Sequence, residues 1–362
     1  MCTSLLYLDT ENRPYVGRTL ELSIALPYLV ARFPRHMAWS SQAEGHAAID
    51  FTTQYALLGV VMPYESLPTD HMQPQQLTLI EAVNEKGLSY SVQSYNDAGG
   101  PQPYLEPTKD TLSVVDLGMY LLGTCASISE VKTALTQVQV ALKKLPMLGG
   151  LEMPFHYALR DSTGATLVIE FHQGELSVYD NPVGVMTNGP AFNWHLTNVN
   201  NYTYLSNIDH YTNQFMQYVA QQPGTGNAKA GLPASDTSVD RFIRAVYYAN
   251  FAEKQSDADQ AVHMVAHIMN NFDRPRGITR DAADAHQAHL SVQGVPTSQL
   301  PTEYTSWTSI TDLTRQRLYL RDSSAMNYVC LDLAAQADHN QFKLIPLQEL
   351  LQPVPDVSQQ LA

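Results

Sequence analysis

Cys2 is the residue whose type and position most directly suggest chemistry, because it directly follows the initiator methionine. Removal of Met1 would leave a thiol and a free α-amine on one residue. A thiolate is a strong nucleophile, and an α-amino group with a pKa of ~8 can act as a base near neutral pH. An ordinary buried cysteine that begins a strand is the alternative interpretation. The position alone leaves both interpretations open.

Four further polar residues are candidates to serve such a cysteine, but each also has an ordinary structural explanation. Arg18 and Glu21 lie three positions apart in GRTLEL, where a strand would point them to opposite faces, so an exposed charged strand end is expected. Asn188 ends an apolar run before Gly-Pro, which favours a turn. Arg241 begins an amphipathic helical pattern, where an exposed arginine is expected.

The sequence contains no persuasive metal or cofactor motif. His263 and His267 have the spacing of helical zinc ligands, but Met264 stands where the zinc-protease pattern needs glutamate. Cys125 and Cys330 are too scattered for a disulfide framework. A glycine-rich phosphate loop and a GxSxG nucleophile motif are also absent from the sequence. We therefore expect neither a metal nor a cofactor.

The composition indicates a globular, acidic chain. Of its 362 residues, 44% are hydrophobic, which suffices for a large core, and the formal net charge is −14. Such acidity disfavours binding to nucleic acid or to an anionic membrane. No run approaches the ~18 apolar residues of a membrane helix, and the start lacks the pattern of a signal peptide. A cytoplasmic location is expected for the chain as written, or a periplasmic one if a signal peptide was removed.

Apolar periodicity predicts strand runs that alternate with pairs of helices. Expected strands lie at 2–9, 15–23, 302–322 and 327–333, and 154–180 is expected to form three strands joined by turns. A glycine turn followed by the second arm of a hairpin is expected at 84–95, and helices are expected at 111–122, 127–141, 239–252 and 258–271. Ser127 has the type and position of a helix N-cap. This order favours a layered α+β architecture. One domain is expected over 1–348, with a polar excursion at about 205–238 and a flexible tail at 349–362.

A series of sequence blocks resembles the choloylglycine hydrolase family, which includes bile salt hydrolases and penicillin V acylases. The resemblance spans residues 2 to about 333. In chain order, the blocks that carry it are MCTSLLYLD, YVGRTLELS, NEKGLSYS, PFHYALRDSTGATLVIE, VGVMTNGP, NWHLTN, GLPASDTSVDRFIRAVY, RPRG and TEYTSWTSITD.

The resemblance implies an N-terminal-nucleophile hydrolase with a four-layer αββα sandwich, two antiparallel sheets between helix layers, and no metal. Cys2 matches the nucleophile that removal of Met1 exposes. Arg18 matches the arginine beside the thiol, and Asn188 matches the asparagine that helps to hold the oxyanion. Arg241 matches the second arginine of the pocket.

Two positions of the sequence depart from the family pattern. Glu21 stands where the family usually has aspartate, the carboxylate that anchors the N-terminal amine. Ser94 stands where bile salt hydrolases usually carry asparagine and penicillin V acylases usually carry tyrosine. Tyr95 follows one position later. A backbone N–H near Ser94 is expected to help hold the oxyanion.

The resemblance therefore implies an amidohydrolase that cleaves a small-molecule amide, with penicillin V as the first expected substrate. Conjugated bile salts and acyl homoserine lactones are the alternative substrates. A binding protein whose catalytic site has decayed is the contrasting possibility, because Glu21 and Ser94 depart from the pattern. The polar excursion at 205–238 corresponds in position to a segment that relatives use for tetramer assembly, so a homotetramer is expected.

Overall fold

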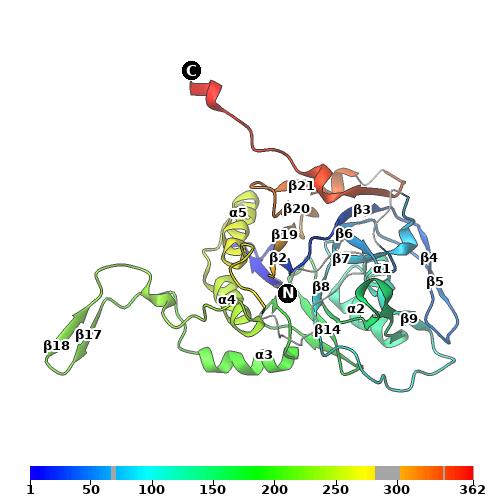
Figure 1. Cartoon of the computed structure of the whole chain (residues 1–362), viewed down its shortest axis with the longest axis horizontal. Coiled ribbons are helices and arrows are strands. Elements are labelled where there is room, and N and C mark those ends of the chain that lie inside the picture. The colour runs from blue at the N-terminus through cyan, green and yellow to red at the C-terminus, as the bar shows by residue number, and fades with distance from the viewer. Residues whose placement is uncertain (67–70, 282–301, 337–338, 362) are drawn as a thin grey trace.

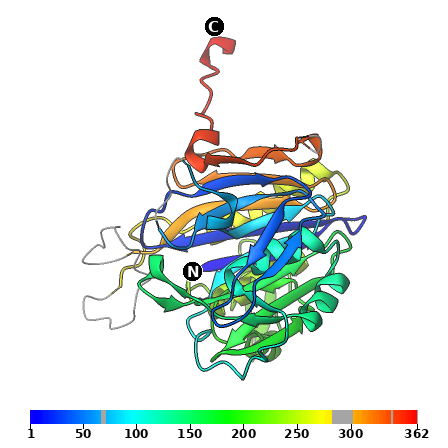
Figure 2. The ribbon, with the colours of Figure 1, turned by 90° about the vertical axis from the view of Figure 1, so that its right-hand side faces the viewer.

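Two antiparallel β-sheets lie face to face between two layers of helices in the computed structural model of the chain (Figure 1). The structure describes residues 1–66, 71–281, 302–336 and 339–361. Figure 2 shows the stacked strands from the side, with the tail extending beyond the body of the molecule. The four-layer αββα fold class that the resemblance implies is confirmed.

The N-terminal strand lies inside the first sheet, so a neighbouring strand pairs with each edge of that strand. Its strand order is β16-β1-β2-β19-β20-β21, and neighbouring strands are antiparallel. The strands are β1 (Cys2–Leu8), β2 (Pro14–Leu22), β16 (Val185–Met186), β19 (Tyr304–Asp312), β20 (Arg317–Asp322) and β21 (Val329–Asp332).

The second sheet is built largely from successive hairpins, which explains its simple strand order, β15-β14-β13-β8-β7-β6-β3-β22. The turn at Gly87 has a positive φ of 76°, which glycine adopts without steric cost, and it joins β7 to β8 in the predicted hairpin. The strands are β3 (Leu29–Phe33), β6 (Leu57–Pro63), β7 (Leu77–Asn84), β8 (Ser89–Ser94), β13 (Phe155–Arg160), β14 (Thr166–His172), β15 (Glu175–Asp180) and β22 (Lys343–Pro346).

Helices cover the outer face of each sheet, and local sequence signals define where several of them begin. The helices α1 (Leu117–Thr124) and α2 (Ile128–Gln137) cover the second sheet, whereas α4 (Ser238–Phe251) and α5 (Ala258–Met269) cover the first (Figure 1). Ser127, Thr237 and Asp257 accept backbone N–H bonds as the N-caps of α2, α4 and α5. The predicted Ser127 cap is therefore confirmed.

Two of the predicted helices are wrong in part. The segment 111–122 begins as the short strand β9 (Thr111–Ser113) and becomes α-helical only at Leu117. Helix α2 ends at Gln137, and the next residues form β10 (Gln139–Ala141), which pairs with β9 in parallel. A long-range backbone pairing thus overrides the local helical pattern at both ends of this region.

The remaining elements are short and lie around the two sheets. Two of them, β17 and β18, form a hairpin inside the polar excursion, which projects from the body of the molecule (Figure 1). These elements are β4 (Ala38–Ser41), β5 (Ile49–Thr52), β11 (Lys144–Leu145), β12 (Leu151–Glu152), α3 (Phe192–Val199), β17 (Thr212–Phe215), β18 (Tyr218–Gln221) and α6 (Leu347–Leu350).

The packing of α5 onto the first sheet requires a glycine at position 17. A Cβ atom on Gly17 would lie 2.6 Å from the Met269 sulfur and 2.8 Å from a Val265 methyl group. Both contacts are much shorter than van der Waals contact. The strand that carries Arg18 and Glu21 can therefore approach α5 only because residue 17 lacks a side chain.

Gly17→Ala should lower the free energy of unfolding by about 1–3 kcal/mol, because the new methyl group forces α5 away from β2. Denaturant unfolding followed by circular dichroism measures this change. Gly224→Ala is the matched control, since its Cβ would have no neighbour within 4 Å among the described residues. An unchanged stability for Gly17→Ala would contradict the close packing of α5 on β2.

Candidate active site

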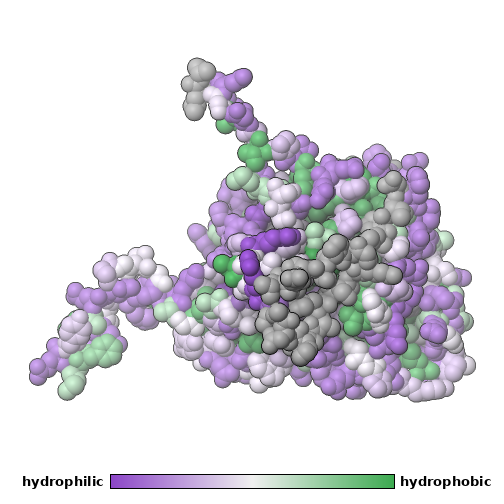
Figure 3. Space-filling model, in the orientation of Figure 1, coloured by the Kyte–Doolittle hydropathy of each residue, from purple (hydrophilic) through white to green (hydrophobic). Residues whose placement is uncertain are grey.

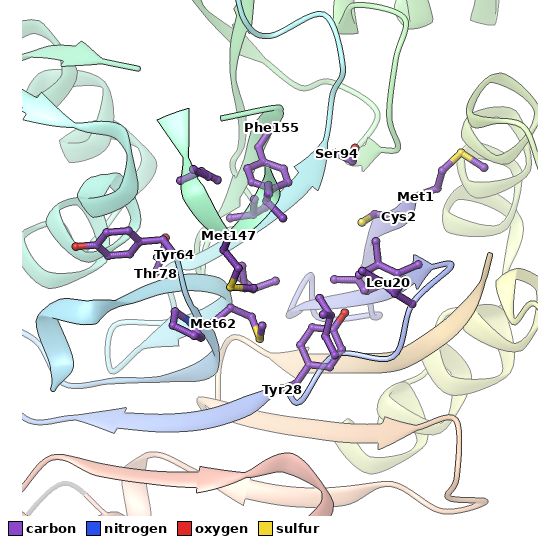
Figure 4. Close-up of a pocket in the computed structure, with 18 residues that line it drawn as sticks. Met1, Cys2, Leu20, Tyr28, Met62, Tyr64, Thr78, Ser94, Met147 and Phe155 are labelled. Carbon is purple, nitrogen blue, oxygen red and sulfur yellow. The ribbon is translucent and has the colours of Figure 1, made fainter. Parts of the chain in front are cut away.

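Cys2 is the first residue of β1, and its side chain is 4% exposed. Strand β2 holds it in register, with Cys2 opposite Leu20. Cys2 and Met1 both line a cavity between the sheets (Figure 4). The Met1 sulfur lies 3.3 Å from a guanidinium nitrogen of Arg241. The thiol is therefore presented at the end of a rigid interior strand.

Arg18 lies beside this thiol and is fully buried, so the expectation of an exposed strand end is wrong. Its Nη2 is 3.6 Å from the Cys2 sulfur, and its Nη1 donates to Glu81 Oε2 at 2.8 Å. Burial acts to lower the pKa of Arg18, but negative charge at Cys2 and Glu81 outweighs it and raises the pKa. The guanidinium is thus a fixed cation that stabilises negative charge on the sulfur.

Asn188 connects the start of β1 to two other elements. Its Oδ1 accepts from the backbone N–H of Cys2 at 2.9 Å and from Nη2 of Arg241 at 2.8 Å. Its Nδ2 donates to the backbone carbonyl of Ser94 at 2.7 Å. These three contacts fix which end of the side-chain amide carries the NH₂ group. Among the described residues Nδ2 has this one acceptor, so its second hydrogen is not engaged by them.

Arg241 lies on the first turn of α4 and is fully buried, which contradicts the expected exposed helix arginine. It also donates through Nη1 to the carbonyl of Cys2 and to Thr3 Oγ1, the latter at 2.7 Å. Burial lowers the pKa of Arg241, although the carboxylate of Glu21 acts in the opposite direction. Helix α4 is thereby tied to the backbone of β1.

Glu21 is also fully buried, and it lies on the opposite face of β2 from Arg18, as the three-residue spacing predicts. Its Oε1 accepts from the hydroxyl of Thr305 at 3.1 Å, while Oε2 has no partner among the described residues. Burial raises the pKa of Glu21, and Arg241 and the N-terminal amine offset only part of that effect. This carboxyl group therefore keeps one oxygen available near the N-terminus.

A second carboxylate, Glu303, lies beside the N-terminus and is not predicted by the sequence patterns. Its Oε1 lies 3.4 Å from the Met1 nitrogen, and its Oε2 accepts from Arg274 at 3.0 Å. The Met1 amine also donates to the backbone carbonyl of Glu21. The available sequence signal was the position of Glu303 and Arg274 in TEYTSWTSITD and RPRG, two blocks of the family resemblance.

The structure separates the two neighbouring residues Ser94 and Tyr95. Ser94 ends β8 and lines the cavity beside Cys2 (Figure 4). Tyr95 is 1% exposed and does not line this cavity; its hydroxyl lies 2.5 Å from Nδ1 of His172, and its ring stacks on His156. Of the pair, only Ser94 lies where a substrate would contact it.

The cavity in front of Cys2 is almost entirely apolar. It encloses about 760 Å³ including its open mouth, and residues from both sheets form its wall. Its lining includes Leu20, Leu22, Ile24, Leu26, Tyr28, Met62, Pro63, Tyr64, Ile80, Val92, Leu145, Met147, Leu148 and Phe155. Such a surface favours an apolar group that lies next to the thiol.

The described residues contain no group of three or more His, Cys, Asp or Glu side chains placed to hold a metal ion. His263 and His267 lie on α5, outside the cavity that faces Cys2. Among the helices of the described ranges, none is both long and apolar enough to cross a membrane. The residues around Cys2 supply a thiol, amide and guanidinium donors, and carboxyl groups.

Comparison with known proteins identifies relatives across most of the chain. The family described as linear amide C–N hydrolases, choloylglycine hydrolase family, matches residues 2–341. A bile salt hydrolase/transferase from Lactiplantibacillus plantarum is 27% identical over 339 residues, which cover 92% of this chain and 93% of that protein. A bile salt hydrolase/transferase from Clostridium perfringens is 27% identical over 291 residues, covering 77% and 81% respectively.

Solved structures share the fold of this chain. A mutant of the conjugated bile acid hydrolase from Clostridium perfringens superposes with a TM-score of 0.80 at 22% identity, covering 99% of this chain and 100% of that chain. A penicillin V acylase from Agrobacterium tumefaciens has a TM-score of 0.72 at 19% identity and covers 98% of both chains. At these identities the likeness establishes a common fold.

The Glu303 carboxylate should make stability depend on acidic pH. Burial acts to raise its pKa, but the N-terminal amine and Arg274 outweigh burial and hold the pKa below its ordinary value of 4.5. A lowered pKa stabilises the folded state above ~4.5, and this stabilisation is lost as the pH falls through the folded-state value. Glu303→Gln should therefore be less stable at neutral pH, with a flatter pH dependence between pH 6 and pH 3.

Thermal unfolding midpoints over that pH range measure this effect. Glu175→Gln is the matched control, because Glu175 is exposed on β15 and lies away from the N-terminus. Parallel curves for Glu303→Gln and the unmodified chain would contradict the ionic contacts assigned to Glu303.

Proposed function

The chain belongs to the choloylglycine hydrolase family of linear amide C–N hydrolases, and we propose that it cleaves an amide bond through Cys2 after Met1 is removed. The observation that carries this proposal is the position of the Cys2 sulfur. It lies 3.6 Å from the Arg18 guanidinium and faces an apolar cavity that is also lined by Ser94, whose carbonyl accepts from the Asn188 amide. A thiol, a fixed cation and an amide donor therefore lie together beside the space where an acyl group would bind.

In the proposed reaction, the free α-amine of Cys2 takes the thiol proton, and the thiolate attacks the carbonyl carbon of the substrate amide. The tetrahedral oxyanion accepts from Asn188 Nδ2 and from a backbone N–H near Ser94. The ammonium returns its proton to the leaving nitrogen as the C–N bond breaks. Water, deprotonated by the same amine, then hydrolyses the thioester and releases the acid.

Glu21 and Arg241 position the reacting groups in this mechanism. Glu21 has one oxygen without a partner among the described residues, and its pKa responds to the Met1 amine, one residue before the amine that Met1 removal would expose. Arg241 binds the Cys2 carbonyl and the Asn188 side chain together. The glutamate at position 21 therefore replaces the usual aspartate in a site whose other contacts keep the N-terminus in place.

An aryloxyacetyl amide of the penicillin V type is the substrate that we propose first. The cavity wall carries the rings of Tyr28, Tyr64 and Phe155 among aliphatic side chains, and aromatic rings favour contact with an aryl group. The cavity lacks charged side chains among its described lining residues, so the charged part of the substrate belongs on the leaving-group side. Phenoxyacetic acid would be the released acyl product.

Conjugated bile salts are the second candidate, because several relatives carry that activity in their names. The relatives from Lactiplantibacillus plantarum and Clostridium perfringens are both named bile salt hydrolase/transferase. A steroid acid also presents a large apolar body next to an amide. The two candidates differ in the shape of the acyl group, which a direct comparison of hydrolysis rates resolves.

Cys2→Ala should reduce amide hydrolysis at least ~10³-fold while the protein stays folded, because it removes the nucleophile and leaves the strand backbone unchanged. Release of the free amine from penicillin V, glycine- and taurine-conjugated bile salts and a long-chain acyl homoserine lactone provides the measurement. Cys330→Ala is the matched control, since Cys330 is an exposed cysteine on β21.

Retained hydrolysis in Cys2→Ala would refute the proposed nucleophile. If the unmodified, Met1-free chain bound these amides but cleaved none of them, the result would favour a binding protein with a decayed site. A rate on bile salts above that on penicillin V would favour the second candidate substrate.

We also propose that the excursion mediates assembly into a homotetramer and that 1–348 forms the catalytic domain. The hairpin of β17 and β18 projects from the body, and its tip is visibly apolar (Figure 3). Phe215, Met216 and Tyr218 are 60%, 93% and 70% exposed there. An exposed apolar tip on a projecting arm is well suited to pack against a second copy.

Phe215→Ser combined with Met216→Ser should convert the assembly to a smaller species, because the two changes remove the apolar tip. Light scattering after gel filtration measures the mass, for which the unmodified chain should give a multiple of 40.2 kDa. An unmodified chain that runs as a monomer, or an unchanged mass for the double variant, would contradict this role of the arm.

A further inference from the structure

The segment that carries Asn188 leaves the first sheet just before the site. Strand β16 ends at Met186, so the carbonyl groups of Thr187 and Asn188 have no strand partner. Both residues are buried, with 0% and 6% exposure. A buried carbonyl without a hydrogen bond is costly, and an unsupported peptide plane could rotate. Other side chains must therefore hold this segment in place.

Two buried histidines supply the missing donors. His156 on β13 donates through Nε2 to the carbonyl of Thr187 at 3.0 Å, and His195 on α3 donates through Nε2 to the carbonyl of Asn188 at 2.8 Å. Both imidazoles are fully buried. The direction of each bond follows from chemistry, because a carbonyl oxygen can only accept. Two successive peptide planes are thus held by rings from two different elements.

Each ring is itself fixed by its surroundings. The Nδ1 atom of His156 faces Glu170 Oε2 at 3.1 Å, and Glu170 also accepts the backbone N–H of Phe192, the first residue of α3. The ring of His195 stacks on Phe242 of α4, with centroids 4.5 Å apart and planes 9° apart. Neither imidazole can turn without breaking one of these contacts.

Helix α4 holds the other side of the same peptide. The hydroxyl oxygen of Ser238 accepts the backbone N–H of Asn188 at 2.9 Å, and it lies 2.9 Å from the Thr187 hydroxyl. Ser238 lies one turn before Arg241, which binds the Asn188 side chain. The main-chain N–H, the main-chain carbonyl and the side-chain oxygen of Asn188 therefore all have partners, whereas one Nδ2 hydrogen has no acceptor within the described ranges.

We propose that His195 is a positioning residue for the amide reaction: by holding the carbonyl of Asn188, it sets where Asn188 Nδ2 meets the oxyanion. His156 supports the preceding peptide in the same way. This inference rests on the proposed function, because it assigns to Asn188 the role of oxyanion donor. His195 contacts no substrate and acts only through Asn188.

The protonation state of His195 keeps its hydrogen bond to Asn188 the same across the neutral pH range. Burial lowers its pKa to about 4, so the imidazole is neutral above pH 5, with its single proton on Nε2. The other ring nitrogen, Nδ1, has no partner among the described residues. Charged or titratable groups that act on this ring are His156, Glu170 and Arg241. The donor to Asn188 is therefore present throughout the neutral range.

His195→Phe and His195→Gln test this role. The phenyl ring of the first variant keeps the stacking on Phe242 but removes the donor, whereas the amide nitrogen of the second can replace Nε2. The readouts are kcat and KM for the cleaved amide, together with the rate at which iodoacetamide alkylates Cys2. Alkylation displaces iodide from a saturated carbon and forms no oxyanion, so it reports the thiolate alone.

We expect kcat to fall about 10- to 100-fold in His195→Phe, with KM and the alkylation rate changed less than about threefold. His195→Gln should regain most of the lost kcat. His263→Phe and His263→Gln are matched controls on an exposed position of α5 and should leave all three quantities unchanged. If His195→Phe does not fold, His195→Met replaces it as the variant without a donor.

Two outcomes would overturn the inference. The first is an unchanged kcat in the folded variant without a donor. The second is a loss of alkylation rate equal to the loss of kcat, which would indicate general damage to the site. Failure of the proposed function is distinguishable, because the unmodified chain would then cleave no amide whichever residue occupies position 195.

Discussion

The hydrogen bonds of the Asn188 side chain are the interaction on which the rest of the site depends. They join the start of β1, the end of β8 and the first turn of α4 through Cys2, Ser94 and Arg241. Because these groups are buried, a missing partner would cost the full desolvation penalty of a polar group. The two sheets and the outer helix layer therefore meet in one arrangement, and that arrangement presents the thiol to the cavity.

The other side of the thiol depends on a cation that the fold keeps between the two sheets. Arg18 comes from the first sheet, yet it donates to Glu81 and to the carbonyls of Ile80 and Val92 in the second. The central carbon of its guanidinium group lies 4.9 Å from the centroid of the Trp307 ring. A buried guanidinium is tolerated because several acceptors surround it. The same contacts that join the sheets thus place a positive charge beside the sulfur.

Much of the fold could be predicted from local sequence patterns, whereas the site could not. Periodicity located the strands around Cys2 and the helices α4 and α5, and the Ser127 cap follows from one hydroxyl at the right spacing. The helix predicted at 111–122 is partly wrong, because β9 pairs with a segment that local propensity does not reveal.

The spacing of residues in the sequence could not predict which charged side chains are buried. Arg18 and Arg241 look like exposed charges in sequence, but most of their acceptors lie 16 or more positions away. Glu303 and His195 were missed for the same reason, since their partners are distant residues or backbone groups. The family resemblance identified the candidate site where local patterns failed, because it compares whole blocks of sequence and so includes such long-range contacts.

The central claim is tested most directly by mass spectrometry of the N-terminal peptide after rapid acid quenching of the enzyme with penicillin V or a conjugated bile salt. We predict a peptide that begins at Cys2 and carries the acyl group as a thioester. An enzyme that turns over substrate with Met1 still attached, or with the acyl group on another residue, would contradict the claim.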